Sequence, residues 1–407
     1  MKIGIVAPGI WNSIHLDMAR ALGALSHDVA IYTEDGRAPS GARFLRLREG
    51  RLDFFVIHHL RRNPWTWFID RLAKPWLGRR FFTTLAAMAR YFAATRDCDL
   101  YFVEGDWIGF FVAILARFMP LRWVVCIHDS DYLRLPLAFP GRPASRWKEA
   151  VKLWVLGSAD LVRANSFVTR DALVAGGCAP ERIRVVPLHI TGWMRVDAIA
   201  DMAAFKAQAR LEVHSQWCIP SEGRLLITMC RLVPVKGLDL AIRGFAVAAR
   251  RNRGLYLMIC GGDRVVPGIG SYRERLAGIA AQEGVAAQVI FTGNIDIREA
   301  KRYFAAADLQ LAPSVIDTFN YGVIEAAMVE TYTIAGDMVG AGPWVKEVGA
   351  ATIVPGRDPE VWGRAIEEFI ASGVPPFLGS AITAQLEPRC IAAMLLELGR
   401  EVMSLPA

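Results

Sequence analysis

Residues 313–328 read Pro-Ser-Val-Ile-Asp-Thr-Phe-Asn-Tyr-Gly-Val-Ile-Glu-Ala-Ala-Met and carry the clearest structural signal in the chain. An apolar run precedes this segment and its second half is typical of a helix, so we predict a strand-to-helix turn. Asp317 then lies in the turn, and Glu325 lies in the second turn of the helix. Free backbone N–H groups and the helix dipole favour an anion at such a terminus. Two acids beside an anion-binding turn suit a sugar joined to a diphosphate.

A second segment, residues 229–239, reads Met-Cys-Arg-Leu-Val-Pro-Val-Lys-Gly-Leu-Asp. Here an apolar strand runs into a loop that contains Arg231 and Lys236, and another helix follows. The guanidinium of Arg231 is a rigid group that can form two parallel hydrogen bonds, and the ammonium of Lys236 is a compact charge on a flexible side chain. Together they can hold a pyrophosphate without a metal ion. The segment therefore predicts a second part of a diphosphate site.

Together the two segments resemble the retaining GT-B glycosyltransferases, specifically glycosyltransferase family 4. That family has an Arg…Lys-Gly loop after the first strand of its C-terminal domain and a Glu-x7-Glu motif further along the chain. The resemblance spans most of the chain and is strongest from Leu225 to Ala335. It implies an α/β protein of the GT-B fold, with two Rossmann-like, doubly wound parallel-sheet domains that face each other across a cleft.

The rest of the chain agrees with this fold class, because short β-branched runs alternate with longer helical patterns. We predict strands at residues 2–7, 29–33, 100–103, 123–127, 161–164 and 184–187, and at residues 225–229, 255–260, 289–292, 309–312 and 332–335. The predicted domains are an N-terminal acceptor-binding domain (1–190), a linker region (191–220) and a C-terminal donor-binding domain (221–375). Residues 376–407 are predicted to be helical and to return to the N-terminal domain, as the last helix does in the family.

The resemblance implies roles for the charged residues of both motifs. Arg231 and Lys236 would grip the leaving diphosphate and stabilise the charge that develops as the glycosidic bond breaks. Glu325 would accept hydrogen bonds from the ribose hydroxyls. Asp317 stands where the family usually has glutamate, and its shorter side chain changes the contacts with the donor sugar. The competing explanations are that Glu325 serves only the helix dipole and that Asp317 only caps the helix.

Other candidate residues lie in loops after strands. Asn320 stands where the family has glycine, and the turn should survive because asparagine tolerates a left-handed backbone. His128 follows an apolar strand, where the resemblance places a histidine beside the reacting sugar, although a lone histidine is often structural. Gly9 lies in the first strand-to-helix loop, where the family's double glycine is absent. The predicted donor-binding residues are Gly9, Gly261, Gly262, Phe319, Asn320, Tyr321, Gly322 and Glu325, and the predicted catalytic residues are Arg231, Lys236, Asp317 and His128.

Cofactors and metal ions are not expected. The sequence has no Cys/His cluster with metal-ligand spacing, so we predict that no residue binds a metal ion. A nicotinamide or flavin enzyme would need Gly-x-Gly-x-x-Gly directly after a first strand, and neither residues 4–9 nor residues 225–237 have it. The expected co-substrate is instead a UDP- or GDP-linked sugar.

Charge and cysteine content bear on location and partners. Residues 51–96 hold nine Arg or Lys against two Asp, interleaved with aromatic residues, which suits an anionic membrane surface. The alternative is a pair of core helices with ordinary surface arginines, and no nucleic-acid-binding motif accompanies the charge. The seven cysteines form no Cys-x-x-Cys pair and are read as buried free thiols of a reducing compartment. No signal peptide or membrane span is evident, so we expect a cytoplasmic protein, peripheral on the inner face of the plasma membrane.

The function predicted from these features is that of a retaining, metal-independent hexosyltransferase. It would move a sugar from a nucleotide-diphosphate donor to an acceptor hydroxyl, on a lipid-linked or cell-envelope glycan. Two alternatives remain open. One is a catalytically degenerate nucleotide-sugar-binding protein at the membrane surface, suggested by Asp317 and Asn320, and the other is a GT-B phosphorylase, which would need a pyridoxal phosphate lysine.

Overall fold

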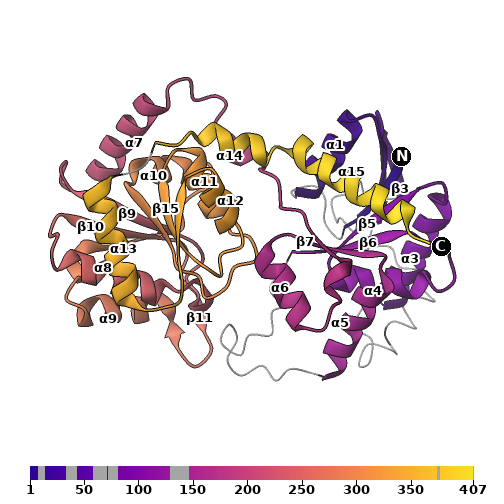
Figure 1. The fold of residues 1–407 in the computed structure, drawn as a ribbon, viewed down its shortest axis with the longest axis horizontal. Helices are drawn as coiled ribbons and strands as arrows, with labels where there is room; N and C mark the ends of the chain where they lie inside the picture. The colour runs from indigo at the N-terminus through magenta and orange to yellow at the C-terminus, as the bar shows by residue number, and fades with distance from the viewer. Residues whose placement is uncertain are drawn as a thin grey trace. The chain divides into compact units, whose positions relative to one another are not determined.

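The structure is a computed structural model that describes residues 1–7, 14–33, 44–57, 71, 81–128, 146–373 and 376–406. The described residues form two compact units (Figure 1). The first unit runs from the N-terminus to His189 and also contains the chain from Leu386 onward, and the second runs from Ile190 to Gln385.

The first unit is built on a sheet with the strand order β3-β4-β2-β1-β5-β6-β7-β8. Its strands are β1 Lys2–Val6, β2 Asp28–Thr33, β3 Phe44–Glu49, β4 Leu52–Ile57, β5 Leu100–Glu104, β6 Trp123–Ile127, β7 Leu161–Ala164 and β8 Ile183–Val185. All neighbouring pairs are parallel except β3 and β4. Its helices are α1 Ile14–Ala24, α3 Phe81–Ala94, α4 Asp106–Leu115, α5 Arg146–Ser158, α6 Phe167–Ala175 and α15 Pro388–Ser404.

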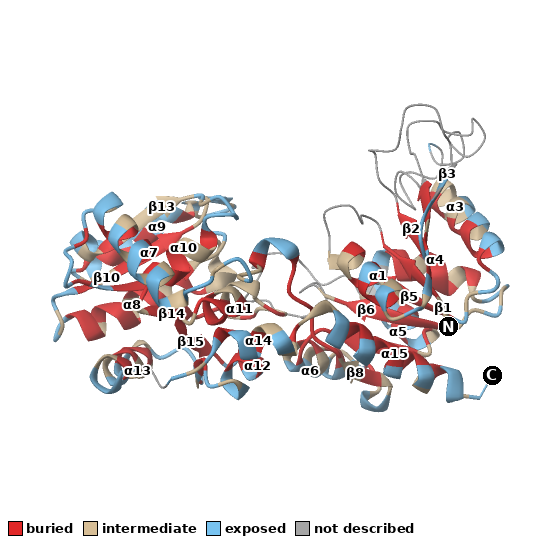
Figure 2. Ribbon diagram, turned by 90° about the horizontal axis from the view of Figure 1, so that it is seen from above, coloured by how far each residue is buried: buried red, intermediate tan, exposed pale blue. Residues whose placement is uncertain are grey.

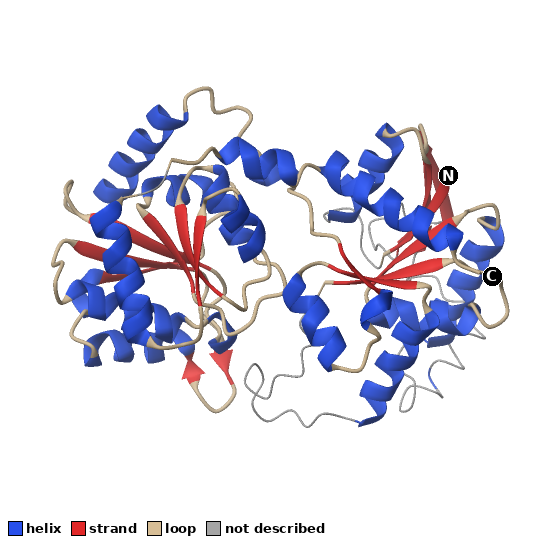
Figure 3. Ribbon diagram, in the orientation of Figure 1, coloured by secondary structure: helices blue, strands red, loops and turns tan. Residues whose placement is uncertain are grey.

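The second unit has a fully parallel sheet with the order β13-β10-β9-β14-β15-β16. Its strands are β9 Arg224–Met229, β10 Leu255–Cys260, β13 Val289–Gly293, β14 Leu309–Ala312, β15 Tyr332–Gly336 and β16 Ala351–Val354, and β11 Val265–Val266 pairs separately with β12 Gly270–Ser271. Its helices are α7 Met202–Gln216, α8 Leu238–Ala249, α9 Tyr272–Gln282, α10 Ala300–Ala306, α11 Tyr321–Met328, α12 Gly342–Glu347, α13 Pro359–Ser372 and α14 Gly379–Gln385. Helices cover both faces of this sheet (Figure 3).

Burial explains why the central strands read as continuous apolar runs. Every residue of β6 and of β15 is buried, as expected for parallel strands with helices on both faces (Figure 2). Trp123 anchors the core of the first unit and Trp362 that of the second. Cys126, Cys178 and Cys260 are buried as predicted, but the prediction is wrong for Cys218 and Cys390, which are exposed at the ends of helices.

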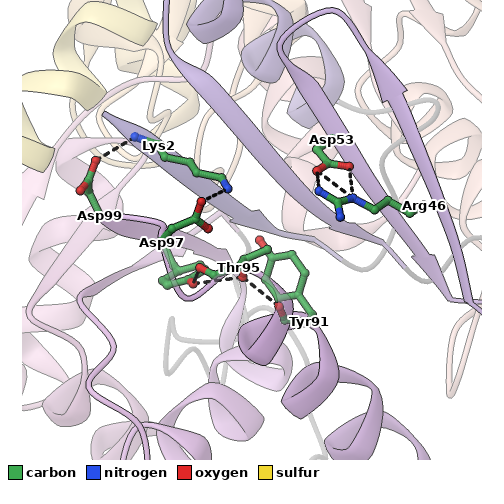
Figure 4. A network of polar contacts seen from close by, with 8 residues as sticks. Lys2, Arg46, Asp53, Tyr91, Thr95, Asp97 and Asp99 are labelled. Carbon is green, nitrogen blue, oxygen red and sulfur yellow. Dashed lines mark hydrogen bonds and ion pairs between the residues drawn. The ribbon is translucent and has the colours of Figure 1, made fainter.

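Five strands were not predicted: β3, β4, β16 and the two-residue strands β11 and β12. β3 and β4 lie in or beside the basic segment that was assigned to a surface, and their charges pair across the strands. Arg46 Nε donates to both oxygens of Asp53, at 2.9 and 3.0 Å (Figure 4). In the same view Thr95 Oγ1 donates to the Tyr91 carbonyl, at 2.9 Å, which helps to close α3. β16 is a four-residue strand at the sheet edge, where the sequence pattern is weakest.

The predicted linker region is also different in the structure. Within residues 191–220, helix α7 packs against α10, and Val213 is completely buried. Asp201 caps α7 by accepting a hydrogen bond from the Ala204 N–H, at 2.9 Å. The range 191–220 therefore belongs to the second unit rather than forming a linker.

Helix α15 is the C-terminal part of the first unit and packs on α1. Its buried face includes Ile391, Leu395 and Val402. Arg122, which precedes β6, donates to the Val402 carbonyl at 2.7 Å. Among the residues that the structure describes, no helix is long and apolar enough to cross a membrane.

Candidate active site

The two sequence motifs meet at one edge of the second sheet. β9 and β14 are neighbours, and the strand order reverses between them, because β10 and β13 lie on one side and β15 and β16 on the other. Arg231 and Lys236 follow the carboxyl end of β9, and Asp317 follows that of β14. In open parallel sheets this switch point is where ligands bind.

The loops after β9 and β14 are fastened to each other. The Val315 N–H donates to the Val235 carbonyl at 2.8 Å. Gly237 has a φ of 66°, and a Cβ there would lie 2.0 Å from the Pro313 carbonyl oxygen. Only glycine fits this contact. The Lys-Gly pair of the motif therefore lets the two loops form one surface.

Lys236 and Asp317 form a nearly buried ion pair in which Nζ donates to Oδ2. The Ser314 hydroxyl lies 3.5 Å from the same carboxylate oxygen. Arg231, by contrast, is exposed and has no ion-pair partner among the described residues. A bound phosphate would therefore share Lys236 with Asp317, whereas the guanidinium of Arg231 is available.

The turn before α11 is held by Asn320 rather than by Asp317. Asn320 has a left-handed backbone, with φ 73°, and its side-chain oxygen accepts a hydrogen bond from the Gly322 N–H at 3.1 Å. The prediction that asparagine keeps the left-handed turn is confirmed, and Asp317 is not the helix cap. Phe319 is only 3% exposed, and its ring packs on Tyr321 and Trp344, so it supports the turn from inside.

Glu325 lies in the second turn of α11, as predicted. Burial raises the pKa of its carboxyl group to about 7, and the indole N–H of Trp193 opposes this shift. Near neutral pH the group is therefore divided between its acid and carboxylate forms. Trp193 lies in the 3₁₀ turn Gly192–Met194, and no feature of the sequence connects it with Glu325.

Gly261 and Gly262 allow the loop after β10 to pack closely. At Gly261 a Cβ would lie 1.8 Å from the Cys230 carbonyl oxygen, and at Gly262 it would lie 2.5 Å from the Asn294 side-chain oxygen. The Gly261 N–H donates to the Gly293 carbonyl at 2.8 Å. The two glycines thus bring the loops after β9, β10 and β13 together at the same edge. Asn294, which sequence reasoning missed, belongs to this group.

The first sheet has a similar edge, where its order reverses between β1 and β5. Glu104 ends β5, His128 follows β6, and His15 lies at the start of α1. Glu104 Oε2 is hydrogen-bonded to His128 Nε2, and Oε1 lies 3.7 Å from His15 Nδ1. Glu104 was not predicted, although it ends the apolar run Leu-Tyr-Phe-Val-Glu, where a carboxylate is unexpected in a core strand. Gly9 lies outside the described residues.

The charges around Glu104 explain its ionisation. Burial alone would raise its pKa, but His15, His128 and Arg163 together hold the pKa well below its usual range. Burial lowers the pKa of His15, which keeps that ring neutral near pH 7. Cys126 Sγ, Glu104 and His128 place potential ligand atoms within 4.8 Å of one another, a grouping not apparent from the sequence. Burial raises the pKa of the Cys126 thiol, which favours its protonated form.

Two parallel-sheet units, each with a switch point lined by polar residues, define the class of GT-B proteins. Residues 210–376 match the family described as glycosyl transferases group 1, and residues 9–189 match the glycosyl transferase 4-like domain. The chain therefore belongs to the GT-B glycosyltransferases of the family 4 type, as its two motifs predict.

Curated relatives include two proteins named D-inositol 3-phosphate glycosyltransferase. The one from Acidothermus cellulolyticus is 27% identical over 231 residues, covering 54% of this chain and 49% of the relative. The one from Salinispora arenicola is 26% identical over 277 residues, covering 65% and 59%. The chain thus spans about half to three fifths of the length of these relatives.

Solved structures are similar over the whole chain, and they show the fold. Sucrose-phosphate synthase from Thermosynechococcus elongatus has a TM-score of 0.71 at 19% identity, with 99% of each chain covered. Anabaena HepE in complex with UDP has a TM-score of 0.67 at 16% identity, with 100% of each chain covered.

Proposed function

We propose that the protein is a retaining, metal-independent glycosyltransferase that takes a UDP- or GDP-linked sugar and glycosylates an acceptor hydroxyl. The observation that carries this proposal is the joining of the Arg231–Lys236 loop to the Asp317–Glu325 turn at one switch point. A diphosphate needs cations at such an edge, and a ribose needs an acceptor such as a carboxylate. Family membership and the UDP bound to HepE support the same class of donor.

The proposed reaction breaks the bond between the anomeric carbon and the phosphate oxygen and forms a bond from the acceptor oxygen on the same face of the sugar. Arg231 and Lys236 stabilise the negative charge that the leaving diphosphate gains. The acceptor proton passes to that phosphate, so no protein nucleophile is assigned. Asp317 contacts the donor sugar while it orients Lys236, and Glu325 holds the ribose.

A thermal-shift screen against UDP, GDP, ADP and their sugars tests the donor site, because a ligand that binds the folded state raises the melting temperature. We expect one nucleotide and its sugars to raise the melting temperature of the wild type and to leave that of Arg231→Ala unchanged. Arg253→Ala is the matched control, since Arg253 is exposed at the amino end of β10, away from the switch point. No shift with any nucleotide, or an equal shift in Arg231→Ala, would contradict the proposal.

A non-catalytic nucleotide-sugar-binding protein is a second candidate, favoured by the pairing of Lys236 with Asp317, which neutralises one of the two cations. Release of free nucleotide from the donor by purified protein would exclude it. A GT-B phosphorylase would require orthophosphate as a substrate and would show the absorption band of a pyridoxal phosphate Schiff base. The absorption spectrum of the protein and the dependence of its activity on phosphate therefore distinguish a phosphorylase from the other two candidates.

The proposed acceptor is a lipid-linked or envelope glycan. The protein would reach this acceptor by docking on the anionic inner face of the plasma membrane. Residues 58–70 and 72–80, within the basic segment 51–96, lie outside the described residues. An aromatic surface on α4 and α5 offers independent support. Trp107 is 56% exposed and Trp154 36%, and both contact Phe110, at ring distances of 6.4 and 5.8 Å.

Charge near this surface favours an anionic partner. Residues 106–118 and 146–158 hold four basic and two acidic residues. Tryptophan rings and cations suit the headgroup layer of an anionic bilayer. We expect the protein to float with vesicles that contain phosphatidylglycerol and not with phosphatidylcholine alone, and Trp107→Ala to weaken flotation. Leu211→Ala, at an exposed apolar site on α7, is the control. Flotation that is unaffected by Trp107→Ala would rule out this surface.

A further inference from the structure

Glu104 and His128 form a contact for which the proposed reaction has no explicit use. The two residues lie at the carboxyl ends of adjacent strands, and the Gly105 N–H donates to the Cys126 carbonyl at 2.9 Å, which fixes the two strand ends together. The Glu104 side chain is 9% exposed and that of His128 20% exposed. The contact is therefore shielded from water, and its geometry is set by the sheet rather than by mobile side chains.

His128 is held at its backbone as well. The buried side chain of Asn165 donates from Nδ2 to the His128 carbonyl at 3.3 Å, and Asn165 Oδ1 accepts from the Thr169 hydroxyl at 2.7 Å. Asn165 and Thr169 are both completely buried. The residue is thus fixed at its ring by Glu104 and at its carbonyl by α6 and the turn before it.

The chemistry of the contact defines which ring nitrogen carries the proton. A carboxylate accepts hydrogen bonds and donates none, so the proton between Glu104 Oε2 and His128 Nε2 belongs to Nε2. A neutral ring then has Nδ1 as its unprotonated nitrogen. The second oxygen of Glu104 faces His15 at a distance that is too long for a hydrogen bond. The carboxylate therefore acts mainly on His128.

We propose that Glu104 is a positioning residue that fixes the tautomer and the ring orientation of His128. This inference rests on the proposed function, because only in a glycosyltransferase of this type does the family resemblance imply a role for His128 in the reaction. A carboxylate hydrogen-bonded to one ring nitrogen holds a histidine in one tautomer and in a single ring orientation. Glu104 itself touches neither the donor nor the acceptor.

The first test is the tautomer itself. Long-range ¹H–¹⁵N spectra of protein labelled at histidine report which ring nitrogen is protonated, and His128→Gln assigns the signal among the seven histidines. We expect the Nε2–H form, with a slowly exchanging Hε2, in the wild type. Glu104→Gln should lose the slow exchange and give a mixture of tautomers. The Nδ1–H form in the wild type would overturn the proposal.

The second test is turnover with the donor found by the thermal-shift screen. A misplaced group of this kind costs on the order of tenfold to a hundredfold in rate, so Glu104→Gln should lower kcat by that factor and leave KM for the donor nearly unchanged. Glu104→Asp should keep the tautomer and recover part of kcat. Asp160→Asn is the matched control. The Asp160 carboxylate accepts a hydrogen bond from the Trp123 N–H at 2.7 Å, at the amino end of β6 and so at the opposite end of the strand from His128.

The outcomes separate the inference from the function on which it rests. If the wild type turns over no donor, the proposed function fails, and the tautomer experiment still decides whether Glu104 holds His128. If turnover is normal in Glu104→Gln while the protein is folded by circular dichroism, Glu104 does not position His128 for the reaction. Stoichiometric zinc that is present in the wild type and lost in Glu104→Gln would assign the carboxylate to a metal site and would also overturn the proposal.

Discussion

Glu104 and Glu325 occupy comparable places in their two units but ionise in opposite directions. Each lies near the switch point of its sheet, and each is largely but not fully buried. Two histidines and Arg163 surround Glu104 and lower its pKa, whereas burial raises the pKa of Glu325 to about 7 against the opposing effect of the Trp193 N–H. Neighbouring positive groups thus decide whether a buried carboxylate stays charged. The first edge has a fixed negative charge, and the second edge has one that can titrate in the physiological range.

The largest expected effect comes from Arg231, which has no ion-pair partner among the residues that the structure describes. Arg231→Ala should lower kcat on the order of a hundredfold to a thousandfold, because in the proposed reaction the guanidinium stabilises charge that appears only as the diphosphate leaves. Arg231→Lys should recover only part of it, since the ammonium cannot form the bidentate contact. Steady-state kinetics measures both, and full activity in Arg231→Ala would remove the second edge from the reaction.

Glu325→Ala should weaken donor binding by roughly ten- to a hundredfold, because hydrogen bonds to charged groups contribute about 1.5 to 3 kcal/mol. The matched variant is Glu330→Ala, at a residue whose side chain lies beyond the end of α11. Isothermal titration with the nucleoside diphosphate gives the affinities. Equal affinities for wild type and Glu325→Ala would mean that this carboxylate serves only the helix.

The pH dependence of donor affinity should follow Glu325 and not Glu104. In the proposed donor site, ribose hydroxyls donate to the ionised carboxylate, so affinity should rise as pH increases through about 7 and approach a plateau above it. Below pH 7 the loss is at most about tenfold per pH unit for a single titrating group. Glu325→Gln should remove this dependence. Titrations between pH 5.5 and 8.5, a range of roughly three units around the pKa, provide the test.

Folding stability should respond to the two carboxylates with opposite signs. The pKa of Glu325 is raised from 4.5 to about 7 in the folded state, so its stabilising contribution is complete below pH 4.5 and is lost as pH rises through 7. The contribution of Glu104 is present above its unfolded pKa and is lost as pH falls through its lower folded pKa. Urea denaturation should show Glu325→Gln gaining up to about 3 kcal/mol relative to wild type between pH 5 and pH 8. Glu104→Gln should lose stability at pH 7.

The smallest effect is expected at the turn before α11. Asn320→Gly should change the free energy of unfolding by less than about 1 kcal/mol, because glycine adopts the left-handed backbone and Asn contributes one capping hydrogen bond. Asn320→Ala should cost more, since alanine neither caps nor favours a positive φ. Thermal or urea denaturation ranks the three proteins, and an equal stability of the alanine variant would contradict the capping role.

The sequence predicted the features that are determined by residues close together in the chain. The strand and helix of residues 309–328, the left-handed Asn320 and the place of Arg231 after β9 follow from apolar periodicity and turn chemistry. The Lys236–Asp317 pair and the Glu104–His128 contact join residues that are far apart in the chain, so no local pattern shows them. β4 was missed because it lies at the start of the basic, aromatic-rich segment 51–96, which was interpreted as a surface as a whole.

Helix α15 gives the first unit a discontinuous chain, since that unit begins at the N-terminus and is completed by residues after Gln385. During synthesis the last helix leaves the ribosome only after the whole second unit has emerged. Domains tend to fold as units while the chain is made. We therefore expect the second unit to reach its native state first on the ribosome, while the apolar surface of α1 stays uncovered until α15 has been synthesised.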